Sequence, residues 1–185
     1  MDINLDEFEI DDITPIPKKK RKADGGQKGK RGERELCKLF TKRFGKEFTR
    51  TIGSGNRWSQ VASMPSHAKA TFTGDICAPE GFLFSLESKN GYEDKVDLSN
   101  VFASKNKTLD GFLKQSVKEA NDCDRLPMVC WKRKRKPWVA FVRSDDLDPS
   151  LDFDSYMFYW NWTVVSLDKL LELPDNFFFK ELTDA

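Results

Sequence analysis

The sequence predicts an α/β fold in which a mixed central β-sheet is flanked by helices. Two segments, 30–44 and 109–122, carry apolar residues at helical spacing, and short strand-like runs precede, separate and follow them. In chain order, the 185 residues give a helix, a strand, a strand pair, a second helix and two further strands. Helices that alternate with strands in this way are expected to cover a sheet.

The first predicted helix, 30–44, places a carboxylate on its inward face. Gly45 suits its end, and its apolar stripe consists of Leu36, Cys37, Leu39, Phe40 and Phe44. Glu33 lies one helical turn before that stripe and therefore shares it. A buried carboxylate requires a partner, which a metal ion or a basic neighbour could supply. The alternative, a solvated first-turn glutamate favoured by the helix dipole, suits Glu35 better.

A strand pair in the middle of the chain brings further charges together. The segment that begins at Asp75 turns at 79–81 and returns as the strand 82–89. Glu87 and Lys89 project from the same face of that strand because they are two residues apart. Two carboxylates beside an ammonium suit Mg²⁺ binding and phosphodiester hydrolysis. Alternatively, Asp75 caps a turn while Glu87 and Lys89 form a solvated pair.

The remaining predicted elements complete the sheet and its edge. Strands are expected at about 47–52, 127–131, 138–142 and 158–165. Ser166 has N-cap chemistry for a helix at 167–173. Five consecutive cations form a predicted hairpin tip between two of the strands: Lys132, Arg133, Lys134, Arg135 and Lys136. They either contact a nucleic-acid backbone or keep the tip soluble.

The charge is unevenly distributed along the chain, which indicates a polyanionic partner. The formal net charge is only +1. Residues 1–17 contain six acidic and no basic side chains, 18–50 contain fourteen basic against four acidic, and 145–185 contain ten acidic against two basic. A basic middle between acidic ends fits a protein that presents one positive surface to DNA. The alternative for each run is a solvated face.

Composition also predicts three regions. They are a disordered acidic and basic N-terminal arm, a core, and an acidic aromatic C-terminal extension on the core or at a dimer interface, at 1–27, 28–144 and 145–185 respectively. Within the core, the predicted loop 53–73 carries Arg57 and Trp58, which could contact phosphate and stack on an exposed base. Alternatively, Trp58 packs under its own loop.

Several classes of protein are disfavoured. His67 is the only histidine and the four cysteines lack zinc spacing, so histidine triads and zinc sites are poor candidates. No apolar run approaches the roughly 18 residues of a membrane span, so we expect an intracellular protein, in the bacterial cytoplasm if it is phage-encoded. The basic run 18–22 resembles a nuclear localisation signal, but we interpret it as a DNA-contacting arm.

These motifs resemble those of the PD-(D/E)xK nuclease superfamily, and within it the archaeal-type Holliday junction resolvases and their phage-encoded relatives. The resemblance runs from about Lys28 to Val142. The residues that carry it are Gly74-Asp75-Ile76 and Glu87-Ser88-Lys89 as core signature, with Glu33, Arg50, Ser54, Asn90 and Gln115 around them. Gly74 stands where the family usually has proline, and the interval from Ser54 to Asp75 resembles that of phage members rather than archaeal ones.

The resemblance implies a restriction-endonuclease-like core and a Mg²⁺-dependent, structure-selective endodeoxyribonuclease, in which Mn²⁺ is expected to substitute. Asp75, Glu87 and the Ser88 carbonyl would hold the metal. Lys89 would position the attacking water, and Glu33 would complete the site or hold a second cation. Residues expected to contact phosphate or DNA are Arg34, Arg50, Ser54, Arg57, Gln115, Lys132, Arg133, Lys134, Arg135 and Lys136.

The expected substrate is a four-way DNA junction, with neither a membrane nor a small molecule as partner. Such a junction has two-fold symmetry, so cutting two strands implies a homodimer with two active sites. Two rivals stay open. One is a nuclease of the same fold that acts on nicked, flapped or sequence-specific duplex. The other is a non-catalytic DNA-binding accessory, against which the intact Asp75, Glu87 and Lys89 argue.

Overall fold

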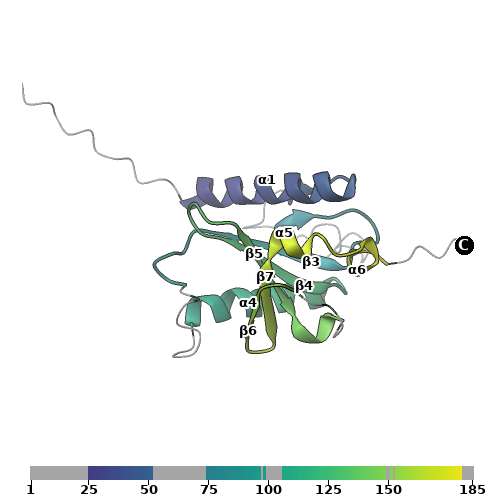
Figure 1. The fold of residues 1–185 in the computed structure, drawn as a ribbon. Coiled ribbons are helices and arrows are strands. Elements are labelled where there is room, and N and C mark those ends of the chain that lie inside the picture. The colour runs from purple at the N-terminus through teal and green to yellow at the C-terminus, as the bar shows by residue number, and fades with distance from the viewer. Residues whose placement is uncertain are drawn as a thin grey trace, which may run out of the picture.

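The structure is a computed structural model that describes residues 25–51, 74–96, 98, 106–148, 151 and 153–180. Within these residues a seven-stranded sheet, in the order β1-β2-β3-β4-β5-β7-β6, lies between helices (Figure 1). The helices are α1 (Gly25–Phe44), α4 (Lys107–Asp122), α5 (Leu167–Leu170) and α6 (Asp175–Phe178), with a 3₁₀ turn, η1, at Ser144–Asp146. The strands are β1 (Thr49–Arg50), β2 (Ile76–Cys77), β3 (Phe84–Asn90), β4 (Leu126–Lys132), β5 (Trp138–Arg143), β6 (Tyr156–Tyr159) and β7 (Trp162–Ser166).

The sheet is mixed because β3 and β4 run parallel. Their register pairs Phe84 with Leu126 and continues to Asn90 opposite Lys132, whereas the other described strand pairs are antiparallel. Parallel neighbours require a crossover connection, and α4 lies in the segment that joins these two strands. The predicted α/β fold, with a mixed sheet flanked by helices, is therefore confirmed.

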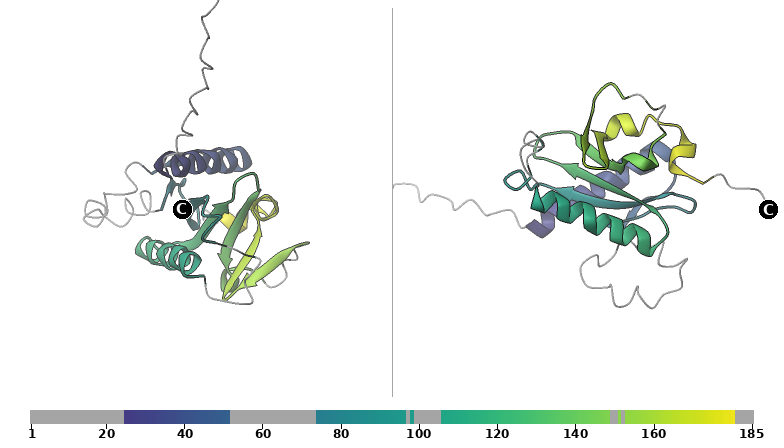
Figure 2. Two further views of the ribbon diagram at one scale, coloured as in Figure 1. Left: turned by 90° about the vertical axis from the view of Figure 1, so that its left-hand side faces the viewer. Right: turned by 90° about the horizontal axis from the view of Figure 1, so that it is seen from below.

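Helices cover both faces of this sheet (Figures 1 and 2). On one face α1 packs with α5 and α6, where Phe40 and Leu167 belong to a core that also contains Phe84 of β3. On the other face α4 contributes Leu109 to a second core around Trp131 of β4. Alternate residues of β3 therefore face different helices. Phe84 and Leu86 face α1, whereas Glu87 and Lys89 face α4.

Helix α1 begins at Gly25, earlier than the predicted start at residue 30. Contacts from the end of β3 hold its first turns, because the Asn90 side-chain amide donates to the Lys28 carbonyl at 3.1 Å and the Lys28 ammonium lies 3.5 Å from Glu93. Gly32 permits this approach, since a Cβ there would lie 2.9 Å from the Asn90 side chain. Tertiary contacts thus extend the helix through a segment of weak helix propensity.

The region predicted as one strand at 158–165 is a hairpin, so that prediction was wrong. β6 and β7 pair antiparallel, with Tyr159 opposite Trp162 across the turn at Trp160 and Asn161. Two-residue hairpin turns usually contain glycine, and this turn has none, so no local pattern indicated it. Because β7 also pairs with β5, residues beyond 144 add two strands to the central sheet.

Ser166 does precede a helix, as predicted, but its side chain makes no capping hydrogen bond. Helix α5 ends at Leu170, earlier than the predicted residue 173. Backbone hydrogen bonds from Leu171 to Leu167 and from Leu173 to Leu170 continue as isolated turns. No described helix is both long and apolar enough to cross a membrane.

Candidate active site

Asp75 is positioned where β2 meets β3. It directly precedes β2, and its backbone N–H donates to the Leu86 carbonyl at 3.0 Å. Its carboxylate Oδ2 accepts the Ser88 backbone N–H at 2.9 Å. Since the N–H and C=O of one strand residue point to the same side, the Ser88 carbonyl also faces the Asp75 side of β3. Asp75 is therefore held beside β3 by backbone geometry, as the hairpin prediction required.

Gly74 is required for this close approach. Its φ is +79°, and a Cβ at this position would lie 2.8 Å from the Leu86 carbonyl oxygen. Both observations exclude a larger residue, and proline, with its φ fixed near −65°, could not adopt this backbone. The glycine that stands in place of the usual proline is thus explained by the tight contact between β2 and β3.

Glu87 and Lys89 lie on the α4 side of β3 and form an ion pair. Glu87 is 3 % exposed, and the Lys89 side chain is also largely buried. The Lys89 ammonium lies 4.9 Å from the centre of the Phe112 ring and donates to the Gln115 side-chain oxygen at 3.4 Å. Phe112 and Gln115 both belong to α4, so this helix fixes where the ammonium points.

The electrostatics of the site show more negative charge than its one lysine compensates. Burial raises the pKa of Asp75, and the neighbouring carboxylates Glu33 and Glu119 raise it further. Burial also raises the pKa of Glu87, with Asp75 as the next cause. Burial lowers the pKa of Lys89, but contact with Glu87 outweighs it, so that this pKa is raised overall and the ammonium stays charged.

This donor set fits a hard divalent cation. Two buried carboxylates, with the Ser88 carbonyl directed to the same side, provide oxygen ligands, and a cation would relieve their mutual repulsion. Among the described residues no cluster of three or more His, Cys, Asp or Glu side chains could hold a metal. Two carboxylates completed by backbone, water and phosphate oxygens are nevertheless a usual set for Mg²⁺.

Glu33 has the partner that its buried position demands. The Arg50 Nε lies 2.5 Å from Glu33 Oε2; the Glu33 side chain is largely buried and that of Arg50 is partly exposed. Of the two partners that the sequence left open, the structure supplies the basic neighbour. Arg50 belongs to β1, and the next residue, Thr51, donates its N–H to the Asp75 carbonyl at 3.0 Å. The Glu33–Arg50 pair is therefore adjacent to the Asp75 segment.

Glu119 is a member of this cluster that sequence reasoning missed. Its carboxylate accepts the Gln115 side-chain N–H at 2.9 Å, and its charge raises the pKa of both Asp75 and Glu87. The available signal was its spacing of four residues from Gln115, which places both on one face of α4. Gln115 itself was predicted near the site and lies there.

Comparison with known proteins identifies the family. Residues 24–172 match the model of the family described as "Phage putative PDDEXK endonuclease". The chain belongs to this family. Protein D14 of Escherichia phage T5 is 31 % identical over 133 residues, which are 70 % of this chain and 76 % of that protein. Hjc, a Holliday junction resolvase of Archaeoglobus fulgidus, aligns with 80 % of this chain and 99 % of its own, at 19 % identity and a TM-score of 0.38.

Membership in this PDDEXK endonuclease family makes the protein a nuclease, the coarser part of the functional prediction. It also agrees with the acidic site at Asp75 and Glu87, because nucleases of this superfamily generally use divalent metals.

The hairpin between β4 and β5 differs from the predicted tip of five free cations. Lys132 lies within β4, where it forms an ion pair with Glu35 of α1, so its assignment to the tip was wrong. Burial raises the pKa of Glu35, but hydrogen bonds from Lys132 and Trp138 outweigh it and lower the pKa overall. The Arg133 guanidinium lies 5.5 Å from the centre of the Trp131 ring. The exposed cations of this hairpin are Lys134, Arg135 and Lys136.

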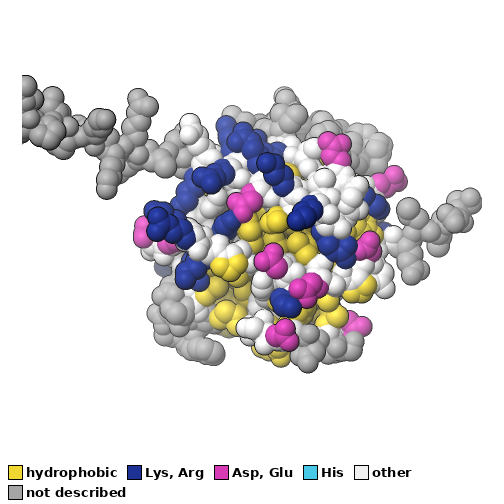
Figure 3. Space-filling view, turned by 45° about the horizontal axis from the view of Figure 1, so that its top comes forward, with side chains coloured by type: hydrophobic (Ala, Val, Ile, Leu, Met, Phe, Trp, Pro, Cys, Tyr) yellow, Lys and Arg dark blue, Asp and Glu magenta, His cyan; other side chains and the backbone are white. Residues whose placement is uncertain are grey.

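A basic stripe along α1 adds to this surface. Arg34, predicted to contact DNA, is exposed, and Lys30, Lys38 and Lys42 are exposed at the same four-residue spacing. Residues four apart share one helix face, and Figure 3 shows Lys and Arg side chains gathered across this side of the molecule. Only Arg34 of this stripe is among the predicted DNA contacts, although the spacing of the other three is visible in the sequence.

Some predicted features lie outside the described residues. They are Ser54 and Arg57 of the loop 53–73, together with Trp58 and the basic run 18–22.

Proposed function

We propose that this nuclease is a Mg²⁺-dependent endodeoxyribonuclease that cuts four-way DNA junctions. The observation that carries the proposal is the group formed by Asp75, Glu87 and Lys89, two buried carboxylates and one ammonium at the meeting of β2 and β3. Burying two carboxylates beside one lysine is costly unless another cation joins them. Such strongly perturbed groups are typical of functional sites.

Each residue has a role that its contacts support. Asp75, Glu87 and the Ser88 carbonyl would hold Mg²⁺, which when bound supplies Lewis acidity toward a phosphodiester. Lys89 is restrained by Glu87 and Gln115, so its ammonium can orient a water for attack on phosphorus. Gln115 is therefore a positioning residue for Lys89.

Arg50 is the proposed phosphate contact at this site. Its guanidinium pairs with Glu33 through Nε and is partly exposed, and guanidinium groups bind phosphate oxygens with good geometry. The Glu33–Arg50 pair would hold the arginine in place before DNA arrives. A second metal bound at Glu33 is less consistent with this ion pair.

Junction preference and dimerisation belong together in the proposal. The ordered set of Glu33, Arg50, Asp75, Glu87, Lys89 and Gln115 resembles that of junction resolvases, and a two-fold symmetric substrate suits a two-fold symmetric dimer. The described residues leave Tyr156 and Phe158 exposed on β6, an edge strand of the sheet. Exposed aromatics on an edge strand suit a contact between two copies.

The deciding experiment compares a synthetic four-way junction with linear duplexes of the same arm sequences, each incubated with purified protein and Mg²⁺. Paired nicks across the junction, with little cutting of the duplexes, are expected. Equal cutting of branched and linear DNA by a monomer in sedimentation would retire the junction proposal and leave a nuclease of other specificity. Absence of cutting on every DNA, with Mg²⁺ or Mn²⁺, would favour a non-catalytic accessory.

A further inference from the structure

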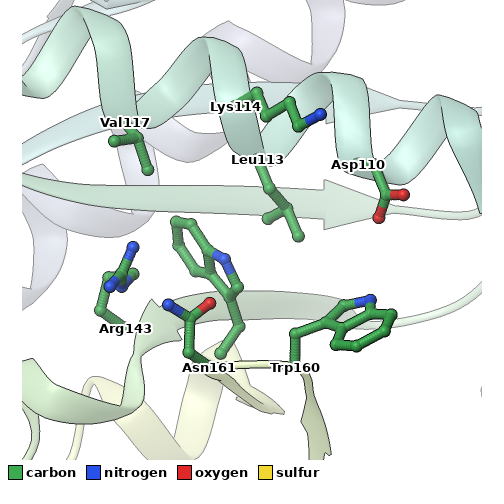
Figure 4. Close-up of a pocket in the computed structure, with 8 residues that line it drawn as sticks. Asp110, Leu113, Lys114, Val117, Arg143, Trp160 and Asn161 are labelled. Atoms are coloured by element: carbon green, nitrogen blue, oxygen red, sulfur yellow. The ribbon is translucent and has the colours of Figure 1, made fainter. Parts of the chain in front are cut away.

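A cavity of about 510 Å³ lies on the far side of α4 from the acidic site. Figure 4 shows Asp110 and Leu113 of α4 pointing toward Trp160 and Asn161 of the β6–β7 turn, with the Lys114 side chain running along the helix beside them. The volume falls within the range of about 300–1,000 Å³ that ligand pockets occupy. Asp75, Glu87 and Lys89 do not line it.

One helix separates this cavity from the acidic site. Asp110, Lys114 and Val117 recur at spacings of three or four and line the cavity. Phe112 and Gln115 face Lys89 instead. A helix with its side chains is about 10–12 Å across, so one DNA strand could contact both flanks of α4.

Trp160 is unusual in both exposure and backbone conformation. The residue is 66 % exposed at the cavity rim, and its φ is +55°. A bulky residue rarely adopts this left-handed conformation, which asparagine and glycine adopt readily. Local strain of about 1–3 kcal/mol of this kind is often retained for function. The Trp160 ring lies edge-on to Tyr159, with 6.5 Å between the ring centres, and most of the residue stays exposed.

The chemistry of the cavity suits a flat aromatic group that carries negative charge. Trp160 offers an exposed ring face at the rim, and buried Trp162 contributes an apolar wall. Cationic groups come from Lys114 and from Arg143, whose guanidinium lies 5.8 Å from the centre of the Trp162 ring. The Asp110 carboxylate also lines the cavity but accepts the Tyr159 hydroxyl at 2.6 Å.

We propose that this cavity binds an unpaired nucleobase of a DNA strand, stacked on Trp160, with phosphates of the same strand contacted by Lys114 at one end of the cavity and by Arg143 at the other. The proposal rests on the proposed function in one respect, namely that DNA is the substrate. Aromatic stacking with flanking cations is the usual way in which proteins hold single-stranded nucleic acid. Branched and nicked DNA both offer bases that can leave the stack. The occupant is therefore a nucleotide of the substrate itself.

The test measures binding in EDTA, where cleavage plays no part, with a labelled single-stranded oligothymidylate of about 12 nucleotides and a duplex of equal length. Trp160→Asn should weaken binding of the single strand by roughly 5- to 150-fold, the effect of losing one stacked base. Trp160→Phe keeps an aromatic face and should retain most of the affinity. The duplex, which has no unpaired base, should bind Trp160→Asn with far less change in affinity than the single strand does.

Trp160→Asn also separates binding from folding, because asparagine suits the left-handed turn position. Its denaturation midpoint should equal or exceed that of the wild type while binding of the single strand falls. Three results would overturn the proposal: unchanged affinity for the single strand, equal loss for single strand and duplex, or loss of dimerisation, which would make the cavity a contact between copies. Each leaves the cleavage test above unaffected, so the two proposals can fail separately.

Discussion

The two flanks of α4 differ in how they use the same helix. Toward β3 the helix presents Phe112, Gln115 and Glu119 to a buried cluster of charges. Toward β6 and β7 it presents Asp110 and Lys114 to an open cavity bordered by tryptophans. Buried charge is expensive and persists only with partners or function. Exposed aromatic surface needs no charged partner, so the side chains allowed on the first flank are more restricted than those allowed on the second.

The largest effect expected on the β3 flank is the loss of cleavage in Asp75→Asn or Glu87→Gln. Each substitution removes a ligand charge while keeping side-chain volume, so cleavage of any cut DNA should become undetectable. DNA affinity should persist, because it comes mainly from phosphate contacts elsewhere. Cleavage assays and anisotropy titrations would measure the two properties separately.

The matched control for these substitutions is Asp122→Asn at the exposed end of α4. It makes the same charge change at the last residue of the helix, which is not among the groups that shift the pKa of Asp75 or Glu87, and it should cleave like the wild type. Near-normal cleavage by Asp75→Asn would remove that residue from the site. Strong loss in the control would instead mean that any charge change on this side of the molecule disturbs the nuclease.

Lys89→Ala should slow cleavage by roughly 100-fold or more, the usual loss when a catalytic proton-transfer group is removed. Lys118→Ala, a change of the same kind at an exposed position of α4, provides the control. Single-turnover rates at saturating protein would isolate the chemical step. A normal rate for Lys89→Ala would reduce Lys89 to the electrostatic partner of Glu87.

Much of the β3 flank could be predicted because its geometry is local. A two-residue spacing places Glu87 and Lys89 on one strand face, and the turn at Pro79–Gly81 returns the chain beside Asp75. A buried Glu33 required a partner, and Arg50 is that partner. Glu119 was missed because its role depends on how α4 packs on the sheet, which no local pattern specifies.

The other flank could not be predicted in the same way. The Trp160–Asn161 turn lacks glycine, so a hairpin was taken for a single strand. A second error lies outside both flanks, on the face of the sheet that α1 covers. There the Lys132–Glu35 ion pair joins residues 97 positions apart, so a lysine expected at an exposed tip is half-buried instead. Both errors have the same physical cause: contacts with distant parts of the chain decided the local structure, and these contacts cannot be deduced from local composition.

Metal-free protein should lose stability as pH rises, because of the buried carboxylates on the β3 flank. Burial raises the pKa of Asp75 to about 6 and that of Glu87 to about 8, whereas unfolded carboxyl groups ionise near pH 4. Between these values the folded state binds more protons than the unfolded state, so its stability falls with rising pH. The midpoints of denaturant unfolding, measured in EDTA, should fall as the pH is raised from about 5 to about 8.5. The two titrations together lower the free energy of unfolding by roughly 5 kcal/mol over this range.

Two additions sharpen this pH experiment. Asp75→Asn removes one titrating group and its repulsion of Glu87, so its stability should vary less with pH. Mg²⁺ binds the ionised carboxylates and should stabilise the wild type most at high pH. A pH dependence that is identical in wild type and Asp75→Asn would show that the charges of this flank are not buried as described.

The smallest effect concerns a surface that belongs to neither flank, the exposed cations Lys134, Arg135 and Lys136 of the β4–β5 hairpin. Replacing all three with serine should weaken binding to junction and linear DNA alike, because phosphate contacts position a substrate without reading it. The plot of log affinity against log salt should flatten by about 0.9 for each phosphate that the variant no longer neutralises. Lys132 is excluded from the substitution, since its ion pair with Glu35 supports the fold.

The matched comparison replaces Lys30, Lys38 and Lys42 of the α1 stripe with serine. If only one of the two triple variants changes the slope of log affinity against log salt, that surface contacts the DNA backbone. Unchanged slopes in both variants would mean that neither surface contacts DNA.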